Sequence, residues 1–364
     1  MSELLTLELD EPLPLAAGGL LPRQQIAYTT RGRLDANAAN AVLVCHPFTH
    51  DAHVSGFGPD GRRGWWDAVV GPGKAIDSDR FFVICSNVLG GCGGSTGPAS
   101  LEPGSGRPYG SRFPLLTIAD MVDAQARLLT RLGIKRLAAV VGGCMGAMQA
   151  LEWGRRHPER VERVVAITIS PATSAHSLAL WRVMRRLIET DPDFRGGDYY
   201  GGPWPKQGLG LSNQVALLLW MGRQQMEERY GRRPAGEQLR FQLGEDFAIE
   251  ELLERVQQST AERFDPNTFR YLSRAMDYFD LESGHPSLAA AVAAMKARVL
   301  LVSYRGDWRY PPAETERLEA ALVEAGVPTQ HLLLDSAWSH GAFLYDPLSL
   351  LVPLRGFLER PRAL

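Results

Sequence analysis

The chain has 364 residues, of which 45% are hydrophobic and 22% are charged, and its net charge is −2. This composition is typical of a folded protein with a large core, and its balanced charge excludes a strongly basic nucleic-acid binder. The N-terminus lacks the pattern of a secretory signal, and no apolar run reaches the roughly 18 residues that span a bilayer. We therefore expect a cytoplasmic protein with neither a nucleic-acid nor a membrane partner.

Short apolar runs rich in β-branched residues predict a series of strands at residues 41–45, 81–85, 137–141, 163–169, 299–303 and 331–334. An amphipathic run over residues 120–132, which ends at Gly133, predicts one of the helices between them. Continuously apolar strands that alternate with helices indicate an α/β fold with a mostly parallel sheet covered on both faces.

Between residues 174 and 285 the strand-like runs disappear, and helical patterns broken by Asp-Pro and Gly-rich turns take their place. Ligands of parallel sheets bind at the carboxyl ends of the strands. We therefore expect residues 1–173 and 286–364 to form the α/β core, and residues 174–285 to be a helical lid inserted over the ligand-binding edge.

Gly142-Gly143-Cys144-Met145-Gly146 forms a G-x-C-x-G pattern between a predicted strand and a helical pattern. This context is typical of a nucleophile elbow, a sharp turn that presents its central side chain above the sheet. A helix N-terminus would also favour the thiolate form. Cys144 is thus the predicted nucleophile, and the alternative is a buried structural cysteine in a Gly-rich turn.

A thiol nucleophile needs a histidine base and an acid that orients it, in the order nucleophile, acid, histidine in this fold. Asp307 follows the predicted strand at 299–303, and His340 follows the strand at 331–334. We predict that His340 is the general base and Asp307 its acid. Asp335 is a competing acid, and a purely structural role for His340 is the alternative.

An oxyanion hole requires two backbone N–H groups, which we expect from Met145, after the nucleophile, and from Phe48, after an early strand. His46, His50 and His53 surround Phe48 in sequence, but few carboxylates or thiolates accompany them. We expect structural or substrate-loop roles for these histidines and no metal.

Five longer segments carry a resemblance to the homoserine O-acetyltransferase family, at residues 64–67, 71–77, 85–98, 142–153 and 271–280. The chain resembles this family over nearly its full length. The resemblance implies an α/β-hydrolase fold with a helical lid, and a homodimer. It also implies a ping-pong reaction that passes acetyl or succinyl from coenzyme A, as a co-substrate, to the nucleophile and then to an acceptor. The family's nucleophile, acid and base fall on Cys144, Asp307 and His340.

The chain departs from the family at three positions of the expected site. Cys144 replaces the family's serine, Gly341 replaces an aspartate that holds the amino group of homoserine, and Asn213 stands where a lid arginine binds the carboxylate. Together with Tyr278, Asn213 and Gly341 are the expected substrate-binding positions. Loss of both charged anchors indicates an acceptor other than homoserine.

The leading hypothesis is acyl transfer from acyl-CoA or a similar thioester to a small-molecule acceptor, through a thioester on Cys144 and with no bound cofactor. Hydrolysis of an ester, lactone or thioester by the same residues is the alternative. A non-catalytic binding protein remains a further class. Homoserine or serine acylation would require substitute anchors, for which Arg223, Arg274 and Asp277 are the candidates in the sequence.

Overall fold

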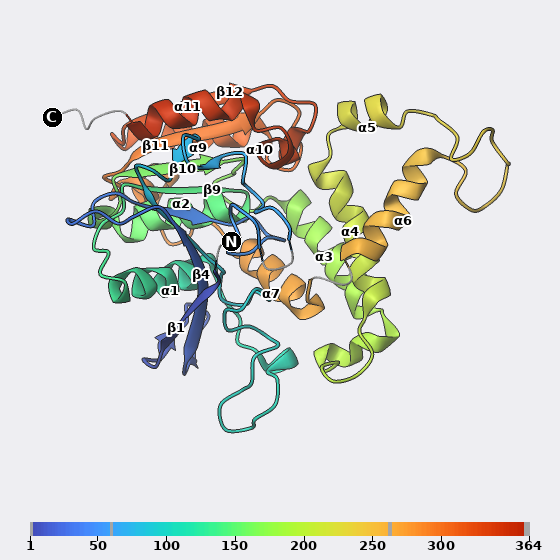
Figure 1. Cartoon of the computed structure of the whole chain (residues 1–364), viewed down its shortest axis with the longest axis horizontal. Helices are drawn as coiled ribbons and strands as arrows, with labels where there is room; N and C mark the ends of the chain where they lie inside the picture. Colours follow the sequence, from blue (N-terminus) through green and yellow to red (C-terminus); the bar gives the residue numbers. More distant parts are fainter. Residues whose placement is uncertain (1–2, 59–60, 261–263, 360–364) are drawn as a thin grey trace.

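The computed structural model describes residues 3–58, 61–260 and 264–359, and the centre of this part of the chain is an eight-stranded sheet (Figure 1). The strand order is β1-β4-β8-β5-β9-β10-β11-β12. The strands are β1 (Leu5–Leu9), β4 (Gln24–Arg31), β5 (Ala41–Cys45), β8 (Phe82–Ser86), β9 (Ala139–Gly143), β10 (Arg163–Ile167), β11 (Arg298–Tyr304) and β12 (Thr329–Leu334). Two small sheets pair β2 (Leu13–Pro14) with β3 (Leu20–Leu21), and β6 (Val70–Gly71) with β7 (Ile76–Asp77).

The prediction of a mostly parallel sheet is confirmed. All pairs from β8 to β12 are parallel, whereas β1–β4 and β4–β8 are antiparallel. Every residue of β5, β9 and β10 is buried, so both faces of these central strands are covered. The predicted strands lie within two residues of the observed ones, but the antiparallel edge formed by β1 and β4 was not predicted.

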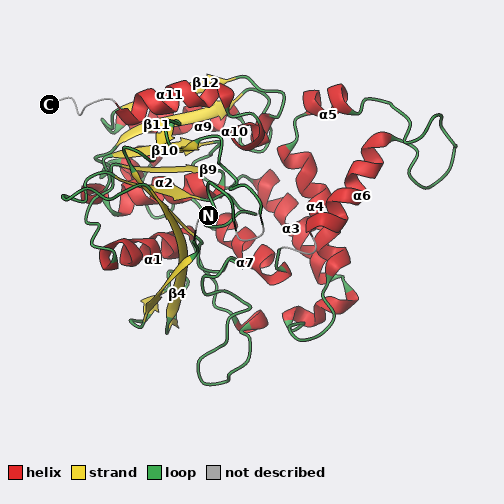
Figure 2. Cartoon of the chain, viewed as in Figure 1, coloured by secondary structure: helices red, strands yellow, loops and turns green. Residues whose placement is uncertain are grey.

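Helices accompany the sheet and also form a separate group beside it (Figures 1 and 2). They are α1 (Ile118–Arg131), α2 (Met145–Arg156), α3 (Ala175–Glu189), α4 (Lys206–Trp220), α5 (Arg223–Arg229), α6 (Ala248–Thr260), α7 (Pro266–Asp277), α8 (Leu288–Val292), α9 (Pro312–Glu324), α10 (Ala342–Tyr345) and α11 (Leu348–Glu359). The predicted helix at 120–132 is α1, which starts at a capping box made by Thr117 and Asp120. Helix α2 packs on β5, β9 and β10.

The segment between β10 and β11 is built from helices, with α4 packed between α3 and α6 and with α7 packed on α3 (Figure 1). In the picture α4, α5 and α6 stand to one side of the sheet, near the ends of its strands. We propose residues 174–285 as a lid on this basis. Within the part of the chain that the structure describes, no helix is long and apolar enough to cross a membrane.

Candidate active site

Cys144 lies at a sharp turn between the end of β9 and the first residue of α2. Its φ of 56° and ψ of −121° are unfavourable for a residue with a side chain, as is usual at a strained functional turn. A Cβ at Gly142 would overlap the backbone of Gly146, and a Cβ at Gly146 would overlap the carbonyl of Cys45. The glycines therefore allow α2 to approach the sheet closely enough to form this turn.

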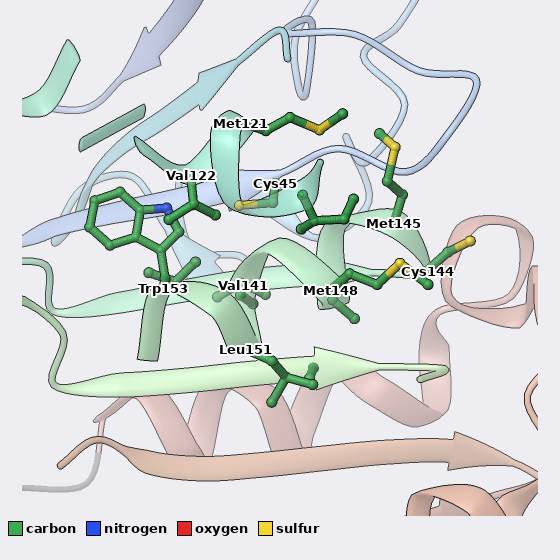
Figure 3. Close-up of a cluster of buried hydrophobic side chains, with 14 of the residues drawn as sticks. Cys45, Met121, Val122, Val141, Cys144, Met145, Met148, Leu151 and Trp153 are labelled. Atoms are coloured by element: carbon green, nitrogen blue, oxygen red, sulfur yellow. The ribbon is translucent and has the colours of Figure 1, made fainter. Parts of the chain in front are cut away.

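The turn sets Cys144 at the margin of the core. Figure 3 shows Cys144 at the edge of a cluster of buried side chains that includes Val141, Met148 and Leu151. Beyond this cluster, Cys144 lines a cavity of about 850 Å³. Helices α3 and α4 contribute Trp181, Asn213 and Trp220 to the same cavity. The thiol is thus placed between the α/β core and the proposed lid.

Asp307 and His340 meet in the structure although 33 residues separate them. The Nδ1 atom of His340 donates a hydrogen bond to Oδ2 of Asp307 at 2.9 Å. The other carboxylate oxygen accepts the backbone N–H groups of Arg309 and Tyr310, both at 3.0 Å. His340 also lies close enough to Cys144 for the two groups to shift each other's pKa. The three side chains therefore stand in the order expected of a nucleophile, a base and an orienting acid.

Asp335, the competing acid, points elsewhere. Its carboxylate accepts a hydrogen bond from Arg305 at 2.9 Å, and its side chain is 77% exposed. A second contact links the loops that carry the predicted acid and base, because the Ser339 hydroxyl donates to the Gly306 carbonyl at 2.6 Å. The geometry therefore favours Asp307 as the acid.

Asp307→Asn should slow the acylation of the protein by an acyl-CoA, whereas Asp335→Asn should leave it within about twofold of the wild type. With its oxygen held by the N–H groups of Arg309 and Tyr310, the amide would turn its NH₂ donor toward Nδ1 of His340 and favour the wrong tautomer of the imidazole, a change that can cost up to about 10⁴-fold in such an arrangement. Stopped-flow release of free coenzyme A measures both rates. An impaired Asp335→Asn beside a normal Asp307→Asn would reverse the assignment.

Charge stabilises the thiolate of Cys144. Burial by itself would raise the pKa of the thiol, but the nearby Arg309 guanidinium and the His340 imidazolium outweigh it and lower the pKa to about 7. Burial would lower the pKa of His340, but Asp307 and the thiolate raise it to about 9. Between these two values the pair exists as thiolate and imidazolium, which is the reactive state of a cysteine nucleophile.

Alkylation of Cys144 by iodoacetamide should rise with pH and reach half of its plateau rate near pH 7, because the thiolate is the species that reacts. Cys92 provides an internal comparison, since burial of its sulfur raises the pKa to about 11. Peptide mass spectrometry after timed alkylation follows both thiols in one sample. A half-point at pH 8.5 or above for Cys144 would contradict this account of the site.

The two expected oxyanion donors lie in the same region. The backbone N–H of Met145 lies close enough to the Cys144 sulfur to help lower the pKa of the thiol. Phe48 lines the cavity, and its ring packs against Trp181 with the centroids 4.8 Å apart. His46 holds the start of the Phe48 loop, since its Nδ1 bonds the Pro47 carbonyl at 2.9 Å and its Nε2 accepts the Val88 N–H at 3.1 Å.

Within residues 3–58, 61–260 and 264–359, no group of three or more His, Cys, Asp or Glu side chains is arranged to hold a metal ion. Of the three histidines near Phe48, His46 is buried and hydrogen-bonded, while His50 and His53 line the cavity. Burial and the neighbouring His46 lower the pKa of His50 to about 4, so its ring is neutral at physiological pH.

Two of the three expected substrate-binding residues reach the cavity. Asn213 and Gly341 line it, but Tyr278 does not. Tyr278 follows the last turn of α7, is 51% exposed and lies under the Arg274 guanidinium. Tyr278 therefore lies outside this cavity, and its substrate-binding role stays a prediction. At Gly341 a Cβ would come within 2.7 Å of the Trp220 carbonyl, so a longer side chain would require α4 to shift.

The candidate substitute anchors also lie away from the cavity. Arg223 is exposed, and Asp277 pairs with Arg185 at 2.6 Å and with Arg274 at 3.1 Å. The charged residue that does line the cavity near Cys144 is Arg309, which sequence reasoning missed. Its position two residues after the predicted acid was the available signal, but the sequence gives no indication that this arginine is buried and faces the thiol.

These features define a class of protein. The α/β hydrolase fold family model matches residues 40–347, so the chain belongs to that superfamily. A homoserine O-succinyltransferase of Alkalilimnicola ehrlichii is 42% identical in sequence to this chain, and the alignment covers 93% of this chain and 90% of that protein. The chain belongs to the homoserine O-acetyltransferase and O-succinyltransferase family, whose members are acyltransferases.

Solved structures agree with this membership. The homoserine O-acetyltransferase from Bacillus anthracis superimposes with a TM-score of 0.92, at 27% identity and over 99% of this chain and 98% of that one. Esterase E22 superimposes with a TM-score of 0.89, at 28% identity and over 99% of this chain and all of the other. The same scaffold thus occurs in a transferase and in an esterase.

Proposed function

We propose that this protein transfers an acyl group from acyl-CoA or a similar thioester to a small acceptor other than homoserine, through a thioester on Cys144. The observation that carries the proposal is that Cys144 and His340 lie close together on the wall of a cavity, while Asp307 holds His340 through a hydrogen bond. Membership of an acyltransferase family supports the reaction class.

In the first half-reaction, the Cys144 thiolate attacks the carbonyl carbon of the donor thioester. The N–H groups of Met145 and Phe48 stabilise the oxyanion, the bond to the coenzyme A sulfur breaks, and the leaving thiolate takes a proton from His340. In the second half-reaction, His340 removes a proton from the acceptor, which attacks the new thioester and releases the Cys144 thiolate. The first half-reaction leaves His340 neutral, and the second returns both His340 and Cys144 to their original protonation states.

Exchange of one thioester for another keeps the acyl group activated at little energetic cost. A thioester on Cys144 is more reactive toward amines, thiols and stabilised carbanions than toward water, which suits transfer. Gly341 and Asn213 carry no charge where the resemblance places an aspartate and an arginine. A site without those charges does not reproduce the recognition of a zwitterionic amino acid.

Homoserine should be a poor acceptor for this protein. Two missing charge-assisted hydrogen bonds, each contributing about 1.5–3 kcal/mol, would lower specificity by about two to four orders of magnitude. The measurement is kcat/KM for homoserine, and for serine as comparison, with acetyl-CoA and with succinyl-CoA. A value of about 10⁴ M⁻¹s⁻¹ or above, ordinary for an enzyme with its own substrate, would restore homoserine as the acceptor.

Hydrolysis is the second candidate, and the similarity to esterase E22 favours it. The same residues would then pass the acyl group to water. Product analysis separates the two activities. With a candidate acceptor present, transfer predicts an acylated acceptor that increases at the expense of the free acid, whereas hydrolysis predicts a free-acid yield that the acceptor does not change.

We also propose that the protein forms a homodimer through the lid and acts in the cytoplasm. Large apolar side chains on two lid helices support the dimer: Leu178 and Val183 on α3, and Leu211 and Leu218 on α4, are between 38% and 52% exposed. Exposed apolar groups of this kind are a feature of subunit interfaces. Sedimentation as a monomer at micromolar concentration would contradict the dimer.

A further inference from the structure

Three side chains on the cavity wall have a buried nitrogen atom that lacks a hydrogen-bond partner among the residues that the structure describes. The atoms are Nη2 of Arg309, Nδ2 of Asn213 and Nδ1 of His50, and the first two can only donate. Arg309 is 8% exposed and Asn213 is 5% exposed. Buried polar groups are nearly always paired, so unpaired donors that face a cavity indicate the kind of ligand the cavity binds.

The side chain of Arg309 is held in place without a carboxylate. Its guanidinium lies 4.7 Å from the ring centroid of Trp181 and 5.3 Å from that of Tyr310. Its backbone N–H, rather than its side chain, bonds Asp307. Within the described part of the chain, no ion pair joins the guanidinium to an acidic side chain, in contrast to the buried Arg185, which pairs with Asp277. A buried guanidinium that has no carboxylate partner, and only the Cys144 thiolate as a nearby cavity-lining anion, is well suited to bind a carboxylate.

The other residues that line the cavity also indicate a negatively charged ligand. Asp51 is the one acidic residue among the described residues that line the cavity, and it is exposed and accepts the backbone N–H of His53 at 2.7 Å. Gly341 offers no side chain at the position next to His340. The cavity therefore presents a buried positive charge and an amide donor, but no buried acid that could bind an ammonium group.

We propose that Arg309, assisted by Asn213, binds a carboxylate carried by one of the two substrates of the acyl transfer. This inference rests on the proposed function and names a substrate class for it. The carboxylate belongs either to the acyl group, as in a succinyl thioester, or to the acceptor. In both cases Arg309 acts as a specificity-determining residue, with a guanidinium that can form two parallel hydrogen bonds to the carboxylate.

The first arm of the test measures single-turnover acylation of Cys144 by succinyl-CoA and by butanoyl-CoA without an acceptor. The second arm starts from the acetylated protein and measures deacylation by 3-mercaptopropionate and by 1-propanethiol. In each arm the readout is the ratio of the rates with the charged and the uncharged reagent. Because both reagents meet the same thiolate or thioester, this ratio cancels any effect of Arg309 on the reactivity of Cys144.

Arg309→Gln should lower the charged-to-uncharged ratio by roughly 10- to 100-fold in one of the two arms, and that arm identifies the substrate that carries the carboxylate. Arg309→Lys should retain part of the preference, because the charge remains without the planar fork. Arg305→Gln is the matched control, since Arg305 lies in the same loop but is exposed and pairs with Asp335, and it should leave both ratios unchanged.

The inference would be overturned if Arg309→Gln slowed the reactions but left the charged-to-uncharged rate ratio unchanged in both arms. Arg309 would then be a residue that stabilises the thiolate. The proposed acyl transfer would stand in that case. If wild-type protein reacts at Cys144 with neither coenzyme A ester, the proposed function itself is wrong. The two failures are therefore distinguishable.

Discussion

Cys144→Ala is expected to reduce acyl transfer to the background rate while the protein remains folded. The thiol lies at the end of β9 at the margin of the core, and alanine keeps the Cβ without the nucleophile (Figure 3). Loss of a nucleophile in comparable sites costs about six orders of magnitude in kcat. Release of coenzyme A from an acyl-CoA in the presence of acceptor measures the activity, and circular dichroism checks the fold.

Cys92→Ala is the control for this experiment, because Cys92 is a free cysteine that does not line the cavity. We expect its activity to remain within about twofold of the wild type. If the folded Cys144→Ala variant kept more than a few per cent of the wild-type rate, Cys144 would not be the nucleophile. The alternative of a structural cysteine in a Gly-rich turn would then be the better account.

His340→Ala should lower the rate of acylation by about 10²–10⁴-fold, the usual contribution of a positioned acid–base group. The variant removes the proton donor for the leaving thiolate and one of the two positive charges that lower the pKa of Cys144. The pH at which iodoacetamide alkylation is half-maximal should therefore move upward from about 7. Both rates can be measured in the same preparation by stopped flow and by peptide mass spectrometry.

His176→Ala is the matched variant for the histidine experiment, since His176 is exposed on α3 and its ring lies 5.2 Å from that of Trp308. It should change neither the acylation rate nor the alkylation profile. Normal acylation by His340→Ala would contradict the proposed role of His340, even if the alkylation profile shifted, because a structural histidine could also affect the thiol pKa.

The central strands could be predicted from the sequence because burial on both faces leaves a continuous apolar run, as in residues 41–45 and 139–143. The two antiparallel strands β1 and β4 could not be found in the same way. In β1, Leu5–Leu9, partly buried and exposed residues alternate, and in β4 polar residues such as Gln24 and Thr29 are buried. Their place in the sheet depends on antiparallel pairing that a short local pattern does not reveal.

The candidate site was predictable where its residues lie in local motifs. Cys144 follows from the pattern of its turn, and Asp307 and His340 follow from their positions after predicted strands. Which side chains line the cavity depends instead on how α3 and α4 pack over the sheet. The sequence therefore gave no reason to exclude Tyr278, which lies outside the cavity, or to choose Arg309, which is buried beside Cys144.

The central claim is that an acyl group passes through Cys144 on its way from donor to acceptor. The most direct measurement is rapid-quench mass spectrometry of the intact protein and its peptides, after mixing with acetyl-CoA or succinyl-CoA. We expect a mass increase of one acyl group on the peptide that contains Cys144, formed at least as fast as overall turnover and absent from Cys144→Ala. Turnover without this adduct, or an adduct that forms more slowly than turnover, would contradict the claim.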